Sequence, residues 1–186
     1  MDESSLTVRR CTRCQELTDS RNRIVDGTGP SDADLLFVGE APGEQEDREG
    51  EPFVGRSGDL LEEALADHDL PRAAVRITNV VRCRPPENRN PTVAERANCR
   101  SYLDREIAVV DPEAVVALGK IPSEELLDRP VAVTEEAGRV ETVEIEGTAY
   151  RVLIGLHPAA TMYDPGTREP FEAAIERAAA IVAGEQ

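Results

Sequence analysis

Four cysteines carry the clearest metal-ligand chemistry in the sequence. Cys11 and Cys14 form a Cys-x2-Cys pair, and Cys83 and Cys99 are separated by 15 residues in the middle of the chain. Two thiolates on one turn can share a metal ion, and sets of four bind either zinc or an iron–sulfur cluster. The long second gap is unusual for a zinc ribbon, whereas clusters tolerate irregular spacing. Four buried structural cysteines are the third alternative, and spacing alone does not decide among the three.

Other residues that could bind a planar ligand follow apolar runs or lie in loops. A glycine-containing turn at 39–43 follows the first run and would let the backbone approach a ligand closely. Phe53 lies in a loop flanked by Gly and Pro, where its ring could stack on a nucleobase or plug the core. Asn79 could read a base edge or cap a turn. His157 ends the last strong apolar run and is a candidate for the active site, whereas His68 lies on a polar helix.

Apolar runs predict the elements that would position these residues. Buried strands are expected at 33–39, 75–81, 114–118 and 150–156. Residues 140–145 could pair with the last strand across Glu146-Gly147. Helices are expected at 60–69, 93–110 and 169–183, the second begun by a capping box of Thr92 and Glu95. This alternation indicates a single α/β domain, residues 1–186, with a mostly parallel sheet whose ligands bind beyond the carboxyl ends of the strands.

The charge balance is strongly acidic, with 21 basic and 37 acidic residues and a net charge of −16. Taken alone, this argues against a nucleic-acid partner, because phosphate binding needs positive charge. Lys120 is the only lysine, and an acidic chain with almost no lysine indicates a halophilic source, with GC-rich coding as the alternative. Between residues 76 and 105, seven arginines outnumber three acids, which favours a basic binding face there.

No run of about 18 uncharged apolar residues is present, and the first residues lack the apolar core of a signal peptide. We therefore expect a cytoplasmic protein without a membrane partner. In a reducing compartment the cysteines are expected to be ligands or catalysts instead of disulfides.

Taken together, the motifs resemble those of the family 4 uracil-DNA glycosylases, the iron–sulfur branch of their superfamily. The motifs are GEAPG, PFVGRSG, TNVVRCRPPENRNP, the Cys-x2-Cys pair and a late His-Pro, and they cover roughly residues 11–158 in the family's order. The resemblance implies a three-layer α/β/α fold with a central, mostly parallel four-stranded sheet. It implies a monofunctional DNA repair enzyme that hydrolyses the N-glycosidic bond of deoxyuridine in single- or double-stranded DNA and leaves an abasic site. From the resemblance and the charge balance together, we expect a monomer from a halophilic archaeon.

The resemblance also assigns roles by position. The ligands of a [4Fe-4S] cluster would be Cys11, Cys14, Cys83 and Cys99. The uracil pocket would consist of the Glu40-Ala41 turn, Phe53 stacking on the ring, Asn79 on the Watson–Crick edge and His157 at O2. Asn88 matches a position proposed to hold the attacking water, and Glu40 would crowd C5 against the methyl group of thymine.

This chain differs from related branches of the superfamily at two places and from family 4 itself at a third. Ala41 stands where related branches carry a catalytic Asp, so no strong general base is expected there. The basic insertion of the DNA-crosslinking relatives is missing between Arg84 and Pro91, which favours turnover over covalent trapping. The loop after His157 lacks the leucines and arginine that usually enter the minor groove, and Met162 is the candidate apolar wedge. Arg84 and Arg89 are the candidate phosphate contacts.

Two other functions compete with this interpretation. A non-catalytic iron–sulfur or zinc module could bind uracil-containing DNA without turnover, and the altered loop after His157 favours it. A metal-dependent phosphohydrolase is the other alternative, but the sequence offers no convincing cluster of Asp and His ligands for it.

Overall fold

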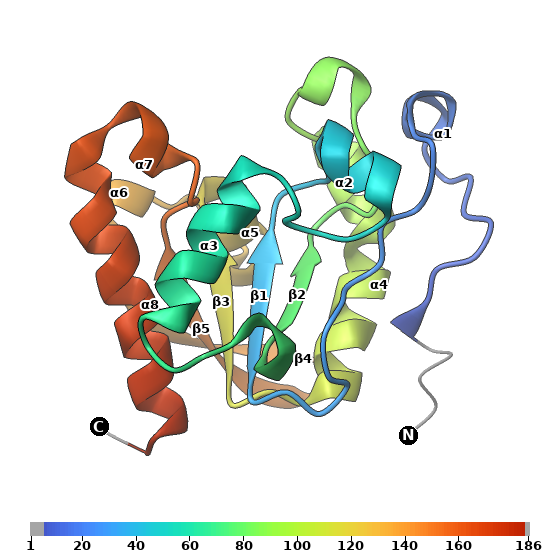
Figure 1. Cartoon of the computed structure of the whole chain (residues 1–186). Helices are drawn as coiled ribbons and strands as arrows, with labels where there is room; N and C mark the ends of the chain where they lie inside the picture. Colours follow the sequence, from blue (N-terminus) through green and yellow to red (C-terminus); the bar gives the residue numbers. More distant parts are fainter. Residues whose placement is uncertain (1–5, 185–186) are drawn as a thin grey trace.

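The computed structural model describes residues 6–184 and contains a five-stranded sheet with helices on both faces (Figure 1). The strands lie in the order β2-β1-β3-β5-β4, and their bounds are β1 (Leu35–Gly39), β2 (Arg76–Asn79), β3 (Ala114–Leu118), β4 (Val140–Ile145) and β5 (Thr148–Gly155). The strands β2, β1, β3 and β5 run parallel, while β4 pairs with β5 in the antiparallel direction. The predicted α/β fold with a mostly parallel sheet is confirmed.

The sheet has five strands where four were expected. Strands β4 and β5 are joined by Glu146 and Gly147, whose φ angles are +50° and +81°. A two-residue turn with positive φ at both positions matches the twist of a hairpin, and glycine adopts it without strain. The additional strand is the edge strand β4, so it leaves the parallel part of the sheet unchanged.

The helices alternate with the strands along the chain. The α-helices are α1 (Gln15–Ser20), α2 (Glu44–Glu49), α3 (Arg56–Ala66), α4 (Val93–Val110), α5 (Lys120–Leu127), α6 (Val133–Glu136), α7 (Ala160–Tyr163) and α8 (Arg168–Val182). The 3-10 helices whose bounds lie within residues 6–184 are η2 (Arg72–Ala74), η3 (Pro86–Asn88) and η4 (Pro165–Thr167). Within residues 6–184, no helix combines the length and the apolar character needed to cross a membrane.

Side chains of β1 alternate between two hydrophobic cores. Leu35 and Phe37 pack in the core formed with α3 and α8, whereas Leu36 and Val38 pack in the core formed with α4 and α5. Every residue of β1 is buried, because a parallel strand is covered on both faces. Figure 1 shows α3 and α8 in front of the sheet, with the strand arrows ending beneath the loops that carry α2, η3 and α7.

Of two predicted helix starts, the structure confirms that of α4 and moves that of α3. Helix α4 begins at the expected capping box, in which the Glu95 amide donates to Thr92 Oγ1 at 3.2 Å and the Thr92 amide donates to Glu95 Oε2 at 2.7 Å. Helix α3 begins at Arg56, four residues before the predicted start, and it includes Gly58 in its first turn, a residue type more typical of loops. A Cβ atom at Gly58 would lie 1.9 Å from the Phe53 carbonyl oxygen, so this glycine lets the loop pack onto the helix.

A buried carboxylate joins β2 to α4. Glu106 accepts a hydrogen bond from Arg76 Nε at 2.6 Å and another from the guanidinium of Arg82, and the three side chains are at most 5% exposed. Asp26 adds a second carboxylate to Arg82 at 3.3 Å. This network fixes the segment before β1 and the start of β2 against α4.

Most arginines of the predicted basic face between residues 76 and 105 have acidic partners. Besides the buried Arg76 and Arg82, Arg89 pairs with Glu95, Arg96 with Glu125, and Arg100 with Asp104 and Glu125. The prediction counted charges along the sequence, whereas several partners of these arginines come from outside the segment. Most of the positive charge is therefore neutralised within the fold.

We predict that Glu106→Gln lowers the free energy of unfolding by about 3–5 kcal/mol, because it leaves the buried Arg76 without a carboxylate partner and leaves Arg82 with Asp26 alone. The loss should be similar in low and molar salt, since buried pairs are screened little. Wild-type stability itself should rise in molar salt, which screens repulsion between the excess acids. Urea unfolding at both salt concentrations measures these effects. Glu144→Gln, at an exposed edge-strand position, is the control and should change stability by less than about 0.5 kcal/mol.

Candidate functional site

A cleft of about 490 Å³ lies at the carboxyl edge of the parallel strands. Five of the predicted site residues line this cleft. The other residues that line it are ones that sequence reasoning did not select. The lining residues are Ala41, Gly43, Glu46, Phe53, Ser57, Asn79, Asn88, His157, Ala159 and Tyr163.

Phe53 reaches the cleft from a strained loop. Its φ angle is +54°, a left-handed conformation that costs a residue with a bulky side chain on the order of 1–3 kcal/mol. Arg72 holds this backbone in place by donating to the Phe53 carbonyl at 3.0 Å and to the carbonyl of Pro52. The Phe53 side chain is only 6% exposed, and its ring centroid lies 5.7 Å from that of His157.

His157 follows β5, and its local contacts define its protonation state. The amide of Ala159 donates to His157 Nδ1 at 3.1 Å, so Nδ1 is an acceptor and the proton of the neutral ring is on Nε2. Burial lowers the pKa of His157 to about 4, while the nearby carboxylate of Glu46 acts in the opposite direction. At neutral pH the side chain is therefore an uncharged imidazole with an Nε2–H donor.

Asn79 ends β2 directly opposite Gly39, with which it is paired in the sheet. Its side chain is buried, yet its amide forms no hydrogen bond to another described residue, so both of its polar atoms are available to a ligand. A Cβ atom at Gly39 would lie 2.4 Å from Asn79 Oδ1 and 2.5 Å from Phe53 Cε2. Glycine at this position is what allows the amide and the ring to share one cleft.

Asn88 enters the cleft from η3, where both it and Glu87 have left-handed φ angles of +54° and +55°. Arg84 Nε donates to Asn88 Oδ1 at 2.7 Å, which holds the amide in one orientation and leaves its N–H groups free. Arg84 also lies 3.9 Å from Glu44. The structure thus places Arg84 behind Asn88, instead of leaving it free for a phosphate as the sequence suggested.

Glu46 lines the cleft, whereas Glu40, the residue expected there, does not. Glu40 is half-buried and lies outside the residues that line the cleft, and burial raises its pKa against the influence of Arg96. Glu46 lines the cleft and accepts from the amides of Gly43 at 3.0 Å and Gly55 at 3.3 Å. Its carboxylate therefore locks the turn after β1 to the loop that carries Phe53. The Gly43-x-x-Glu46 capping pattern was the signal that could have identified it.

The residues expected to contact DNA differ in how exposed they are and in whether they have ion-pair partners. Met162 is half-buried in α7, whereas its neighbour Tyr163 is 86% exposed and lines the cleft. Arg89 forms ion pairs with Glu95 at 2.7 Å and Glu16 at 2.8 Å, so it is engaged within the fold.

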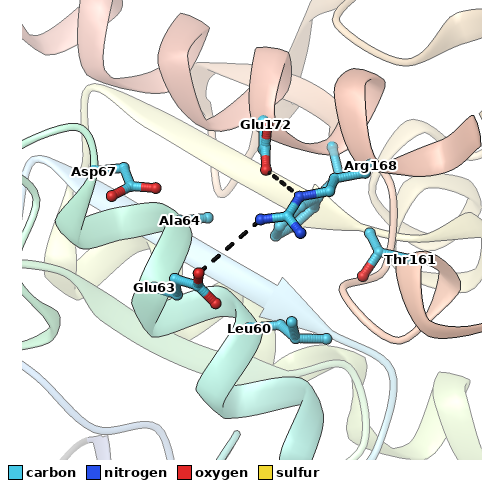
Figure 2. Close-up of a pocket in the computed structure, with 8 residues that line it drawn as sticks. Leu60, Glu63, Ala64, Asp67, Thr161, Arg168 and Glu172 are labelled. Carbon is cyan, nitrogen blue, oxygen red and sulfur yellow. Dashed lines mark hydrogen bonds and ion pairs between the residues drawn. The ribbon is translucent and has the colours of Figure 1, made fainter. Parts of the chain in front are cut away.

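A second hollow lies between α3 and α8 (Figure 2). Arg168 bridges it by donating to Glu172 at 2.7 Å and approaching Glu63 to 4.0 Å. The hollow has a volume of about 20 Å³, which is too small for a ligand. Thr161 of α7 also lines this hollow, so it marks where the segment after His157 packs against α3 and α8.

The four cysteines come from three chain segments and form a neighbourhood beside α4. Cys83 and Cys99 are buried, Cys11 and Cys14 are half-buried, and all four are free thiols. Burial raises the pKa of Cys99 to about 11, and the proximity of Cys83 and Cys14 adds to the rise. Burial likewise raises the pKa of Cys83, with contributions from Cys11 and Cys14. Among the described residues, no three His, Cys, Asp or Glu side chains are grouped so that they could hold a metal ion.

Comparison with known proteins agrees with this arrangement. Residues 27–179 match the family model described as the uracil DNA glycosylase superfamily. The chain is 39% identical to the Type-4 uracil-DNA glycosylase of Archaeoglobus fulgidus, over 95% of this chain and 90% of that protein. It is 40% identical to the Saccharolobus solfataricus protein of the same name, over 89% and 78%. A third, from Thermotoga maritima, is 43% identical over 74% and 72%. The chain therefore belongs to the uracil DNA glycosylase superfamily.

Proposed function

We propose that this protein is a uracil-DNA glycosylase, which hydrolyses the N-glycosidic bond of deoxyuridine in DNA and leaves an abasic site. The observation that carries the proposal is the convergence of Phe53, Asn79 and His157 on one cleft at the carboxyl edge of the sheet. The Type-4 uracil-DNA glycosylases that are 37% to 43% identical to this chain support it.

The target base has to leave the DNA stack to reach this cleft, at a cost of a few kcal/mol. The ring of Phe53 supplies a new stacking surface for the extruded base. Because Arg72 and Gly58 already hold the Phe53 loop in its strained conformation, binding does not have to pay for ordering it.

Asn79 meets the Watson–Crick edge of the base. Uracil offers an acceptor at O4 and a donor at N3–H, and a single amide can pair with both. Among residues 6–184, no neighbouring side chain fixes the orientation of this amide by a hydrogen bond. Rejection of cytosine therefore depends on the cleft as a whole and not on Asn79 alone.

His157 stabilises the leaving group. Cleavage of the C1′–N1 bond places negative charge on the departing uracil, and part of that charge develops at O2. The Nε2–H of the neutral imidazole would donate to O2 in an environment shielded from water, where such a donor gains strength as charge develops. The proton stays on Nε2, because Nδ1 already accepts a hydrogen bond from the Ala159 amide. The ring therefore acts as a donor without releasing its proton.

Water completes the reaction by adding to the sugar cation, and the proton that the water loses neutralises the uracil anion. The cation is already electrophilic, so the water needs positioning more than activation, which is consistent with Ala41 in place of an acid. The amide N–H groups of Asn88, held by Arg84, are placed to orient it. Glu46 holds the adjoining loops, and we assign it a positioning role in place of the crowding role expected for Glu40.

On the DNA side, Tyr163 is better placed than Met162 to contact bases next to the extruded nucleotide. An exposed aromatic ring at the rim can stack on an unpaired base or fill the vacated space. Arg89 would have to break two ion pairs to bind a phosphate, so we assign it a structural role.

The cysteine neighbourhood suits a [4Fe-4S] cluster, which four thiolates at irregular spacing can hold. The four thiols lie close enough to influence one another electrostatically. We propose Cys11, Cys14, Cys83 and Cys99 as the ligands. The bound cluster would supply a crosslink between three chain segments, and no step of base excision is assigned to it.

We further infer that residues 1–186 act as one monomeric domain inside the cell, where the substrate DNA is found. The acid excess and the single lysine support a halophilic source.

Incubation with a uracil-containing oligonucleotide, followed by alkali, tests the proposed function directly. The wild type should produce strand breaks at uracil and none at a matched thymine. Asn79→Asp should lose most of this activity, because a carboxylate cannot donate to O4 and repels it. Binding without strand breaks would identify a non-catalytic module, and an Asp variant that cleaves at the parental rate would remove Asn79 from base recognition.

His157→Ala should lower the single-turnover rate by roughly 10²–10³, the usual loss for one donor to a developing anion. DNA affinity should change little. The wild-type rate should stay level between about pH 5 and pH 8, because the active neutral form predominates above a pKa of about 4. A rate that falls as the pH rises through 6.5 would instead indicate an imidazolium donor.

Protein purified without oxygen should be brown and contain about four irons with sulfide. Iron, zinc and sulfide analysis measures this. Colourless protein with one zinc ion would contradict the cluster while leaving the glycosylase proposal standing.

A further inference from the structure

Arg21 connects the two cysteine pairs. It is the C-cap residue of α1, whose N-cap is Cys14, and its side chain turns back toward the cysteines. One terminal nitrogen of its guanidinium donates to Cys83 Sγ at 2.9 Å, and the other donates to the Cys11 carbonyl at 2.6 Å. A single planar group thus bridges the N-terminal segment and the start of the loop after β2.

The contact of Arg21 with a sulfur is informative, because the chain offers many carboxylates with which an arginine could pair instead. The chain has 37 acidic residues, yet Arg21 forms no ion pair with a carboxylate anywhere in residues 6–184. A guanidinium remains charged at every accessible pH and, when half-buried, is stabilised by an anion. The acceptor it contacts, Cys83 Sγ, becomes anionic when the thiol ligates a metal.

A second sulfur of the site also accepts a hydrogen bond: Asn98 Nδ2 donates to Cys14 Sγ at 3.3 Å. This amide is neutral, so Arg21 is the charged donor of the two. Hydrogen bonds to ligand sulfurs and local net charge are two of the factors that set the potential of an iron–sulfur cluster.

We propose that Arg21 is the positioning residue of the four-cysteine site and that it raises the reduction potential of the cluster bound there. The proposal rests on the cluster proposed above. By bridging Cys83 and Cys11, Arg21 brings the two ligand pairs together before the cluster binds. Once the cluster is bound, the positive charge of Arg21 offsets part of the negative charge of the four thiolates. It thereby stabilises the reduced form of the cluster, which carries more negative charge.

The test compares anaerobically purified wild type with Arg21→Gln, Arg21→Lys and the control Arg23→Gln. Arg23 is exposed, and within residues 6–184 its guanidinium donates a hydrogen bond only to the Glu49 carbonyl, at 3.4 Å. Iron and sulfide content, the reduction potential at an electrode and the rate of iron loss to a chelator are measured for each protein. Arg21→Gln should shift the ratio of reduced to oxidised cluster at fixed potential about tenfold toward the oxidised form, equal to 59 mV for a one-electron couple.

The two further variants separate charge from geometry. Arg21→Lys keeps the charge but cannot make both planar donations, so it should keep most of the potential and lose iron faster than wild type. Arg23→Gln should match wild type in every measurement. If Arg21→Gln binds no iron while the control loads normally, the positioning role is supported and the Lys variant reports the potential.

Two failures remain distinguishable. Wild-type protein without iron would overturn the cluster, and with it the role of Arg21. Wild-type protein with a cluster, together with Arg21 variants that match the control in potential and in iron loss, would overturn the role of Arg21 alone.

Discussion

The close approach of β1 and β2 at their carboxyl ends is the constraint on which the site depends. Gly39 and Asn79 are register partners, and any side chain at Gly39 would collide with both the Asn79 amide and the Phe53 ring. Because the ring occupies that space, its loop has to cross the end of β1 in a left-handed conformation. Arg72 then has to hold the loop, and Gly58 has to admit it against α3. One missing Cβ atom therefore governs the shape of the cleft.

The sequence predicted what depends on local periodicity and much less of what depends on distant contacts. The strand 114–118 and the Thr92 capping box follow from patterns within a few residues, and the structure confirms both. Arg72 acts on a carbonyl 19 residues away, and nothing near it in the sequence marks it as part of the site. Glu46 did have a local signal, but its hydrogen bond with the Gly55 amide, nine residues away, is visible only in the fold.

Charge was the least predictable property from the sequence. Glu106 lies 24 residues from one arginine partner and 30 from the other, so counting charges along one segment could not reveal the pairing. Burying two arginines around one carboxylate removes them from any DNA-binding surface. A protein with a net charge of −16 therefore uses part of its limited positive charge to hold its core together. Its contacts with DNA have to rely more on aromatic stacking and backbone amides than on a broad basic face.

The loop from Cys83 to Thr92 links the cysteines to the cleft. Arg89 ties the end of η3 to Glu95 on α4 and to Glu16 on α1, while Arg21 holds Cys83 at the start of the loop. Between these anchors, Glu87 and Asn88 keep left-handed conformations that an untethered loop would relax. The position of Asn88, and of any water it orients, thus depends on how firmly α1 and its cysteines are held. A cluster there would act on catalysis through the backbone, without touching the substrate.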